Sequence, residues 1–198
     1  MKCIEQSVSC ELEIKKSRFL AEAMPVSTQE EARSMLKEKK AQYAEASHVV
    51  HAFVIGSAGE ILGCSDDGEP SGTAGRPLLD VLKGSGITNI LVTVTRWFGG
   101  TLLGTGGLVK AYGDSVKAVL ALAKTHEIIH TREFSVQVSY DSFDRISREL
   151  STLGVTEVKE TFSTEVLLEG RVIVENIDSF ALRISDLTHG KAHPVFIP

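Results

Sequence analysis

The stretch from Ile87 to Gly107, ITNILVTVTRWFGGTLLGTGG, decides the fold. Its first nine residues, 87–95, are almost all apolar or β-branched, which is typical of a central strand that is buried on both faces. The strand is predicted to end at 96–98, and a glycine-rich loop follows from Gly99 to Gly107. Apolar residues then recur at helical spacing over 108–124. A strand, a glycine turn and a helix N-terminus in this order form a phosphate-type site, because exposed N–H groups and the helix dipole face the ligand.

The residues before this stretch predict strands and a capped helix. Alternating apolar side chains predict strands over 7–15 and 18–26, joined by a basic turn. Ser27 and Thr28 are each followed three residues later by a glutamate, which predicts a capping box and a helix to about residue 46. A third strand is expected over 48–56.

A second loop, GCSDDGEPSGTAGRP, runs from Gly63 to Pro77. A short strand at 61–62 is expected before it, and a short helix over 78–82 with Gly84 as its C-cap after it. Long ordered loops in compact domains are usually functional. Free amides at the end of this loop would attract an anion or an acidic side chain. We expect the two loops to touch, because both lie at the ends of neighbouring elements.

The last seventy residues predict a separate domain. Residues 127–198 supply all of the net charge of −5, whereas 14 of the 17 glycines lie between Gly56 and Gly113. The predicted order of elements is β-α-β-β-α-β, the split β-α-β or ferredoxin-like unit. We therefore predict an α+β protein with two domains, 1–126 and 127–198. In the second, strands are expected at 128–140, 154–162, 165–175 and 192–197, and helices at 141–152 and 177–188.

Composition excludes several classes of protein. With 42% hydrophobic and 24% charged residues, the 198-residue chain is an ordinary globular protein. No apolar run approaches the roughly 20 residues of a membrane span, and the N-terminus has no secretory signal pattern. Three cysteines without a Cys-x-x-Cys pair suit a reducing cytoplasm. The acidic total discourages non-specific DNA binding.

The loops carry side chains that suit metal or nucleotide chemistry only weakly. Asp66, Asp67 and Glu69 are able to hold Mg²⁺, but a tight Asp-Gly turn whose carboxylates bind nearby amides is the favoured interpretation. Neither nucleotide motif is met, because Thr105 replaces the lysine of a P-loop and Val109 replaces a small residue of the dinucleotide fingerprint. We expect no metal and no cofactor.

Nucleophilic catalysis is a weaker alternative. Ser71, Thr73 and Cys64 would each need a base, which His48 or His51 on a neighbouring strand would supply. The favoured interpretation is that the hydroxyls cap the following helix and that the thiol packs as a small apolar group.

Two basic features suggest nucleic-acid contact. Arg96 and Trp97 would bind a base by stacking and phosphate contact, and an equally supported role for Trp97 is to anchor the core. Six cations of the first domain form an RNA-facing patch or, as is favoured, a solvated surface. They are Lys15, Lys16, Arg18, Lys37, Lys39 and Lys40.

The two loops also carry a family resemblance. Residues 65–77 and 96–108 closely resemble the YigZ/IMPACT family, and the similarity runs from Lys15 through Tyr112. The resemblance implies an N-terminal domain with the β-α-β fold also found in domain IV of elongation factor G and in GHMP kinases. It also implies a C-terminal ferredoxin-like domain, in agreement with the pattern of elements.

The family also implies a link to translation. Its eukaryotic members look like regulators of translation that compete for the ribosome-associated activator of a kinase. They carry an extra N-terminal domain of the RWD type for that partner, whereas this chain starts at the signature domain, so the partner is not carried over. For the bacterial branch, the resemblance implies a nucleic-acid or ribosome role.

We therefore expect a non-enzymatic regulator or binding module linked to translation. Its expected partners are RNA, the ribosome or an acidic protein of the translation machinery, bound through the two glycine-rich loops. The alternative is a hydrolase or transferase that acts on a small phosphorylated or peptide-like substrate, with Cys64, Asp67, Glu69 and Thr73 as working residues. The expected binding residues are Asp66, Asp67, Gly68, Glu69, Pro70, Gly72, Thr73, Gly75, Arg76, Arg96, Trp97, Gly99, Gly100, Thr101, Gly106 and Lys110.

Overall fold

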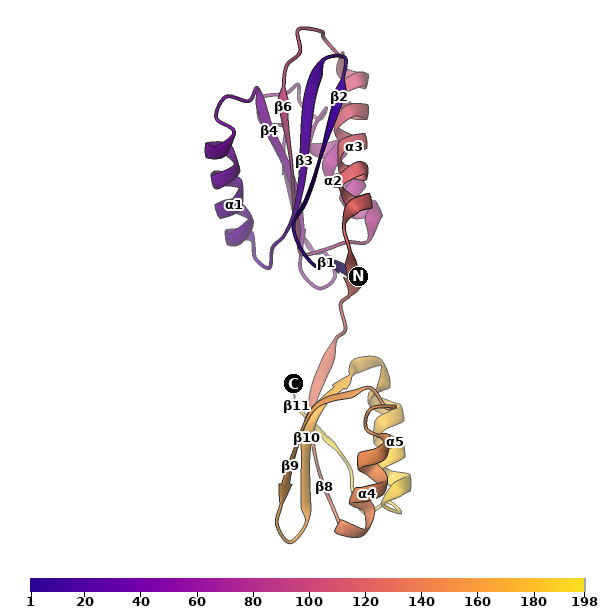
Figure 1. Cartoon of the computed structure of the whole chain (residues 1–198). Helices are drawn as coiled ribbons and strands as arrows, with labels where there is room; N and C mark the ends of the chain where they lie inside the picture. Colours follow the sequence, from indigo (N-terminus) through magenta and orange to yellow (C-terminus); the bar gives the residue numbers. More distant parts are fainter. Residues whose placement is uncertain (198) are drawn as a thin grey trace. The chain divides into compact units, whose positions relative to one another are not determined.

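The computed structural model describes residues 1–197 and divides the chain into two compact units. The first unit is Met1–Ile128, and the second begins at Ile129. Helices and mainly antiparallel sheets make up both units, which confirms the predicted mixture of the two (Figure 1). Among these residues, no helix is both long and apolar enough to cross a membrane.

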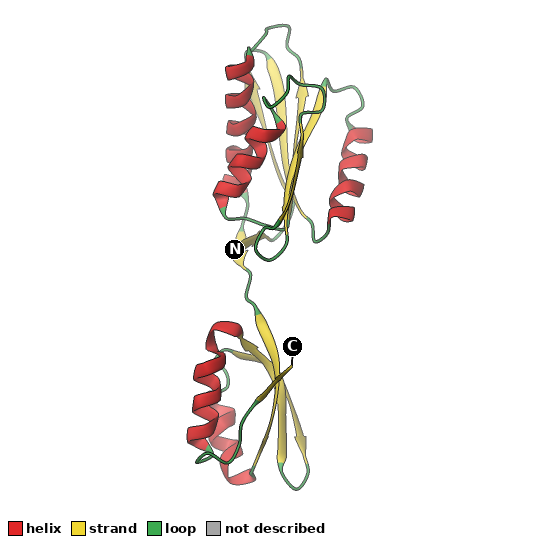
Figure 2. Ribbon diagram, turned by 180° about the vertical axis from the view of Figure 1, so that it is seen from behind, coloured by secondary structure: helices red, strands yellow, loops and turns green. Residues whose placement is uncertain are grey.

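A five-stranded antiparallel sheet forms the centre of the first unit. Helix α1 covers one face, and α2 and α3 cover the other (Figures 1 and 2). The strand order is β2-β3-β6-β4-β5. The elements are β2 (Val8–Ile14), β3 (Ser17–Pro25), α1 (Gln29–Gln42), β4 (His48–Ile55), β5 (Ile61–Ser65), α2 (Gly75–Ser85), β6 (Ile90–Trp97) and α3 (Thr105–Leu122).

Strand β6 is the buried central strand that the sequence predicts. Its side chains alternate between two cores, as the two-residue period of a strand requires. Ile90, Val92 and Val94 belong to the core under α2 and α3. Leu91 belongs to the smaller core under α1, together with Phe53. Because β6 is covered on both faces, the residues at its end are held rigidly.

The predicted capping box opens α1. The Thr28 hydroxyl accepts a hydrogen bond from the Glu31 amide at 3.1 Å, and the Glu31 carboxylate accepts one from the Ser27 amide at 2.7 Å. These contacts satisfy amides that a helix N-terminus leaves unpaired. The helix ends at Gln42, four residues earlier than predicted.

Helix α2 differs from the prediction at both ends. It begins at Gly75, three residues early, because the Asp66 carboxylate accepts hydrogen bonds from the first amides of the helix. Gly84 lies inside the helix, and Gly86 provides the left-handed C-cap with φ 70°. The left-handed conformation that favours glycine thus falls two residues later than expected.

The sequence pattern does not predict two short strands. β1 (Lys2–Ile4) pairs with β7 (Thr125–Glu127), and the Ile128 amide donates to the Met1 carbonyl at 3.0 Å. Three-residue strands are too short to show a period of two.

The second unit has the element order strand, helix, two strands, helix, strand, with both helices on one face of the sheet (Figure 2). The sheet order is β11-β8-β10-β9. Phe134 and Phe180 pack edge to face at 4.6 Å in its core. The elements are β8 (Thr131–Val138), α4 (Tyr140–Glu149), β9 (Val155–Phe162), β10 (Val166–Ile173), the 3₁₀ turn η1 (Val174–Asn176), α5 (Ile177–Leu187) and β11 (Val195–Ile197).

Two glycines of α2 provide a matched test of how closely the start of this helix packs against β5. A Cβ on Gly75 would lie 2.6 Å from the Ser65 carbonyl carbon, whereas a Cβ on Gly84 would meet no atom of the described residues within 4 Å. We expect Gly75→Ala to lower the free energy of unfolding by about 1–3 kcal/mol, because backbone must move. Gly84→Ala should raise it by about 0.5–1 kcal/mol through better helix propensity. Urea unfolding measures both, and equal effects would contradict the described contact.

Candidate functional site

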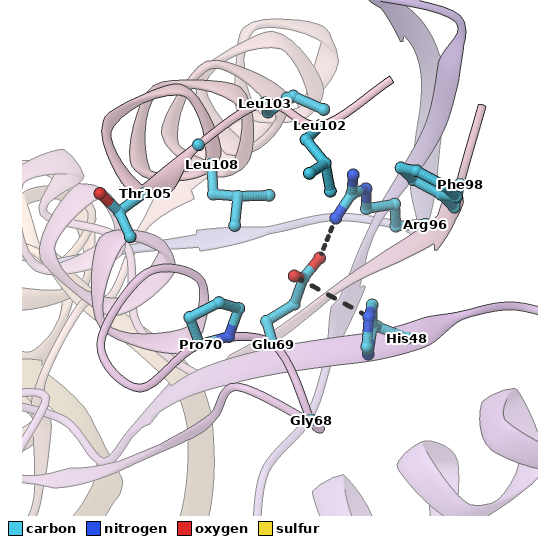
Figure 3. A pocket seen from close by; sticks show the side chains of 11 residues that line it. His48, Gly68, Glu69, Pro70, Arg96, Phe98, Leu102, Leu103, Thr105 and Leu108 are labelled. Atoms are coloured by element: carbon cyan, nitrogen blue, oxygen red, sulfur yellow. Dashed lines mark hydrogen bonds and ion pairs between the residues drawn. The ribbon is translucent and has the colours of Figure 1, made fainter. Parts of the chain in front are cut away.

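The two loops meet, as expected, at a pocket of about 460 Å³ in the first unit (Figure 3). We call it the Arg96 pocket. The first loop contributes its Gly68–Pro70 segment, and the second contributes the residues that lead into α3. Most of the exposed lining is apolar. The lining residues are His48, Gly68, Glu69, Pro70, Arg96, Phe98, Leu102, Leu103, Gly104, Thr105 and Leu108.

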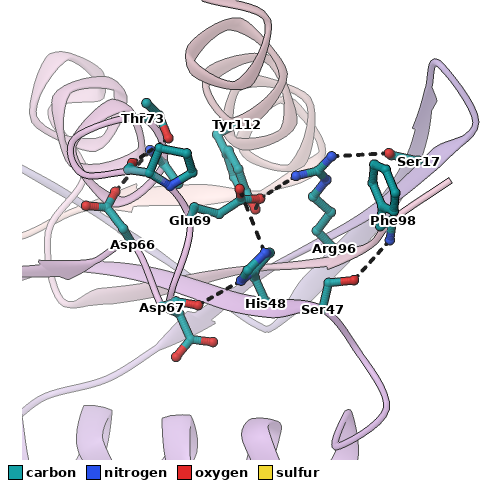
Figure 4. A network of polar contacts seen from close by, with 12 residues as sticks. Ser17, Ser47, His48, Asp66, Asp67, Glu69, Thr73, Arg96, Phe98 and Tyr112 are labelled. Atoms are coloured by element: carbon teal, nitrogen blue, oxygen red, sulfur yellow. Dashed lines mark hydrogen bonds and ion pairs between the residues drawn. The ribbon is translucent and has the colours of Figure 1, made fainter. Parts of the chain in front are cut away.

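The floor of the pocket is a buried ion pair (Figure 4). Arg96 Nη1 donates to Glu69 Oε1 at 2.7 Å, and the Tyr112 hydroxyl donates to the same oxygen at 2.7 Å. Arg96 Nη2 also contacts the Ser17 hydroxyl at 3.4 Å. The side chains of Arg96 and Glu69 are only 6% and 3% exposed. Burial and the adjacent Glu69 charge raise the pKa of Tyr112, so its hydroxyl keeps its proton as a donor.

His48 is oriented by the first loop. Its Nδ1 lies 2.8 Å from the Asp67 carbonyl oxygen, which only accepts hydrogen bonds, so Nδ1 carries the hydrogen. In the neutral ring, Nε2 is then an acceptor. Nε2 lies 3.8 Å from Glu69 Oε2, which is also an acceptor (Figure 4). With the ring in this neutral form, two acceptor atoms face each other across the pocket floor.

Asp66 stabilises the first loop itself. Its carboxylate accepts hydrogen bonds from the amides of Gly72, Ala74 and Gly75 at 2.8–3.0 Å. It thus occupies the N-terminus of α2, where the sequence predicts an anion or an acidic side chain. Burial acts to raise the pKa of Asp66, but the three amide hydrogen bonds outweigh it and hold the pKa below its ordinary value.

Asp67 ties the loop to two other elements. One carboxylate oxygen contacts Lys40 of α1, and the other accepts the Val49 amide of β4 at 2.7 Å. Asp67 has a left-handed backbone with φ 47°, and Gly68 follows at φ 87°. Burial acts to raise the pKa of Asp67, but the hydrogen bonds from Lys40 and Val49 outweigh this effect and hold the pKa below its ordinary value. Within residues 1–197, no cluster of metal-ligating side chains includes these acids.

The second loop is held at its base and exposed at its tip. The Gly99 amide contacts the Ser17 hydroxyl at 3.2 Å, and a Cβ on Gly99 would lie 1.8 Å from the Lys16 carbonyl oxygen. The loop therefore packs against the Lys15-Lys16 turn of the β2-β3 hairpin. Beyond this contact, Phe98 is 49% exposed and Leu102 is 83% exposed.

Comparison with known proteins places this site in a family. Residues 15–120 match the family described as the Impact N-terminal domain, and residues 136–191 match a domain of unknown function, DUF1949. The chain belongs to the IMPACT family. The first match contains both loops and every residue that lines the Arg96 pocket.

Curated members of the IMPACT family extend the similarity to nearly the whole chain. The chain is 36% identical to the IMPACT family member YigZ of Escherichia coli over 90% of its length and 88% of that protein. It is 35% identical to YvyE of Bacillus subtilis, over 96% and 87%. A crystal structure described as a hypothetical protein aligns with all of the chain and 97% of its own, at 33% identity and a TM-score of 0.66.

Several of the expected binding residues lie away from the Arg96 pocket. Arg76 and Lys110 line a separate groove between α2 and α3, together with Gly72. Each cation is paired with an aspartate four residues later, at 2.8 and 2.7 Å. Arg76 and Arg96, both expected to be binding residues, therefore line different cavities, and each is already paired with an acidic side chain.

Trp97 also faces away from the pocket. Successive side chains of a strand point to opposite faces, and Trp97 points to the α1 side while Arg96 points to α2 and α3. The Arg18 guanidinium lies 3.9 Å above its ring, and Tyr43, the C-cap residue of α1, meets it edge to face. Gly100 and Thr101 are in the exposed loop tip, and Gly106 is in the first turn of α3.

The residues named for the alternative enzyme do not converge. The Thr73 hydroxyl donates to the Pro70 carbonyl at 2.6 Å, and Cys64 is on the edge strand β5 with a pKa raised by burial. Sequence reasoning missed Tyr112, because its helical spacing marks it as an ordinary core residue, and it did not include Phe98 or Leu102 among the binding residues. The sequence indicates His48 only as a possible base for a nucleophile.

Asp66 provides a pH-dependent test. Because its native pKa is lowered, the ionised carboxylate stabilises the fold above the pKa of an unfolded aspartate, about 3.9. That contribution is lost as the pH falls through the native pKa. We expect Asp66→Asn to lower the free energy of unfolding by about 1 kcal/mol at neutral pH, as for a lost helix cap. The difference should shrink in acid, as measured by urea unfolding against pH.

The control for this test is Asp80→Asn. Asp80 forms an exposed pair with Arg76, so its loss should change stability by less than about 0.5 kcal/mol. If Asp66→Asn were equally silent at neutral pH, the capping role of Asp66 would be refuted.

Proposed function

We propose that this chain is a non-enzymatic regulator or binding module linked to translation, which binds RNA on the ribosome through the Arg96 pocket. The link to translation comes from the resemblance of eukaryotic family members to translation regulators. The observation that carries the binding role is the construction of the pocket. Its floor is a charge-balanced, hydrogen-bonded cluster, and its rim bears the exposed side chains of Phe98 and Leu102.

The rim suits a single-stranded nucleic acid. Bases stack on exposed aromatic rings and pack on apolar side chains without regard to sequence. An exposed phenylalanine and an exposed leucine on one short loop are otherwise costly, since large apolar groups on a surface favour association. The buried Arg96 orients Glu69 and does not itself offer its charge to solvent.

The cations for phosphate contact come from the neighbouring hairpin. Lys15 and Lys16 are both exposed, and neither forms an ion pair with another described residue. Both have positive φ, of 47° and 65°, in a two-residue turn that presents them beside the loop. Lys39 and Lys40, in contrast, are held by Glu22 and Asp67. An acidic protein segment would use the same free lysines.

Ribosome binding tests the proposal directly. We expect co-sedimentation of the purified chain with ribosomes at moderate salt, and an affinity at least about fivefold lower for the double variant Phe98→Ala, Leu102→Ala. Stacking of one base on an aromatic ring contributes about 1–3 kcal/mol, which sets this scale. Lys15→Asn, Lys16→Asn should weaken binding and lower its salt dependence, because each phosphate contact releases counterions. Asparagine tolerates the left-handed conformation there.

Matched controls separate the pocket from general surface effects. Leu122→Ala, Leu182→Ala removes two other exposed leucines that do not line the pocket, and Lys83→Gln, Lys191→Gln removes two other exposed lysines. Both controls should pellet like the parent chain. Equal loss in variants and controls, or no pelleting of the parent chain, would reject the proposal. Pelleting that survives RNA digestion of the ribosomal fraction would identify a protein partner instead.

A hydrolase or transferase acting on a small substrate is the second candidate, and one observation favours it. His48 is fixed in one tautomer by the Asp67 carbonyl, with Nε2 directed at Glu69 in a pocket, as a general base would be. Glu69 Oε1 is engaged by Arg96 and Tyr112, however, and neither the Thr73 hydroxyl nor the Cys64 thiol reaches His48 in the described hydrogen bonds.

A thermal-shift screen with short peptides and with phosphorylated metabolites that carry no nucleobase distinguishes the two candidates. For a binding module of the kind proposed, we expect no compound of the panel to raise the melting temperature. A substrate at a hundredfold excess over its dissociation constant would stabilise the fold by about 2.7 kcal/mol. A shift of that size that is lost in His48→Phe would favour the enzyme.

A further inference from the structure

We propose that the Arg96 pocket selects a nucleobase that carries an amino group at the position where uracil and hypoxanthine carry a carbonyl, as cytosine and adenine do, and rejects uracil. This inference rests on the proposed function, because it assigns a ligand class to the same site. It follows from the two acceptor atoms on the pocket floor, His48 Nε2 and Glu69 Oε2, which lie 3.8 Å apart.

The two atoms have no other partner in the described network. Glu69 Oε1 takes the hydrogen bonds of both Arg96 and Tyr112, so Oε2 remains available. His48 Nδ1 is committed to the Asp67 carbonyl, which leaves Nε2 available as the lone pair of the neutral ring. A single nitrogen with two N–H groups, placed about 2.9 Å from each atom, satisfies both acceptors.

The charge of the floor favours a neutral donor over an ammonium. The carboxylate of Glu69 is balanced by Arg96, and Tyr112 keeps its proton because its pKa is raised. An ammonium group would therefore bring one uncompensated positive charge into a largely apolar pocket, which is costly. An aromatic amino group offers the same two N–H donors without a charge.

A carbonyl oxygen at the same place would be rejected. Uracil differs from cytosine there by an oxygen in place of the amino group, so its oxygen would face two other acceptors. All three atoms would then be buried without a donor, and sites built for a hydrogen bond discriminate strongly against a group that cannot make it.

The walls of the pocket suit a flat apolar body. Leu102, Leu103 and Leu108 form one side, Pro70 another, and Phe98 stands at the rim (Figure 3). The volume of about 460 Å³ lies in the range of small-ligand pockets and exceeds that of a single base. The chain of a bound RNA would leave the pocket past Gly104 and Thr105, where α3 begins without a side-chain cap among the described residues.

The site favours RNA over the side-chain amide of a peptide, which also has an NH₂ group. A base would place a planar ring in the pocket against Phe98, and its phosphates would face the hairpin of Lys15 and Lys16, which form no ion pair with another described residue. A glutamine or asparagine side chain would leave most of the pocket unfilled.

Short fluorescent RNA oligomers test the selectivity with the full chain. Binding is measured by anisotropy at mildly alkaline pH, above the ordinary histidine pKa of about 6.5. We expect oligo(C) to bind roughly tenfold more tightly than oligo(U), as one good polar base contact discriminates. Oligo(A) should exceed oligo(I) similarly, because hypoxanthine has a carbonyl in place of the adenine amino group.

Two variants test the residues that are responsible. His48→Phe keeps the ring shape and removes one acceptor, so the preference for oligo(C) should fall severalfold with little change for oligo(U). A merely structural role would weaken both oligomers equally. Glu69→Gln places an amide NH₂ toward the pocket, because Oε1 must still accept from Arg96, and should shift the preference toward oligo(U). Should Glu69→Gln fail to fold, His48→Phe alone decides, with His126→Phe as its control.

The outcomes separate this inference from the proposed function. Equal binding of oligo(C) and oligo(U) would overturn the base selectivity and leave an RNA-binding module. Ribosome co-sedimentation without binding of any oligomer would overturn the inference and direct attention to a protein partner. Absence of both would overturn the inference and the proposed function together. A preference for oligo(C) that disappears in His48→Phe would support both.

Discussion

The candidate site depends on one carboxylate. Glu69 is buried, and its Oε1 accepts hydrogen bonds from Arg96 on β6 and from Tyr112 on α3. Removing a charged group from water is costly unless it is paired and hydrogen-bonded, and here both conditions are met. Because the first loop carries Glu69, this contact attaches the loop to the central strand and to the longest helix. Without it, the loops would have no common floor.

The three acids of the first loop have different roles that follow from their positions. Asp66 accepts amides of its own loop and of α2, Asp67 reaches Lys40 and the Val49 amide, and Glu69 points inward. Each carboxylate thus fixes the loop in a different direction. The loop is long and rich in glycine, yet its path is determined by charge-assisted hydrogen bonds rather than by apolar packing. This explains how a segment with few large side chains holds a precise shape.

The sequence predicts the elements well where a pattern is long and strong. The buried strand β6, the capping box of α1 and the order of elements in the second unit all follow from periodicity and capping residues. The missed strands β1 and β7 have three residues each, and the early start of α2 depends on Asp66, nine residues before Gly75. Contacts of that range leave no local signal.

The site is predicted less completely, for the same reason. Its loops are evident from their glycines, and their meeting follows from neighbouring elements. The sorting of Arg76, Arg96 and Trp97 to three different places depends on strand alternation and on the exact end of β6. The helical spacing of Tyr112 marks it as a core residue, yet its hydroxyl donates a hydrogen bond to Glu69. Such assignments depend on contacts between residues that are far apart in the sequence, so they require a structure.

The pairing of β1 with β7 closes the first unit on itself. Residues at both ends of this unit are joined by backbone hydrogen bonds, including that from Ile128 to Met1. The two ends are therefore neighbours, and a short peptide is enough to link them. Only a covalent link between these two ends is needed to make the backbone of the unit continuous. Its gene could be cut and rejoined at an exposed turn to give a circular permutant with the same sheet, the same loops and a free choice of where the chain begins.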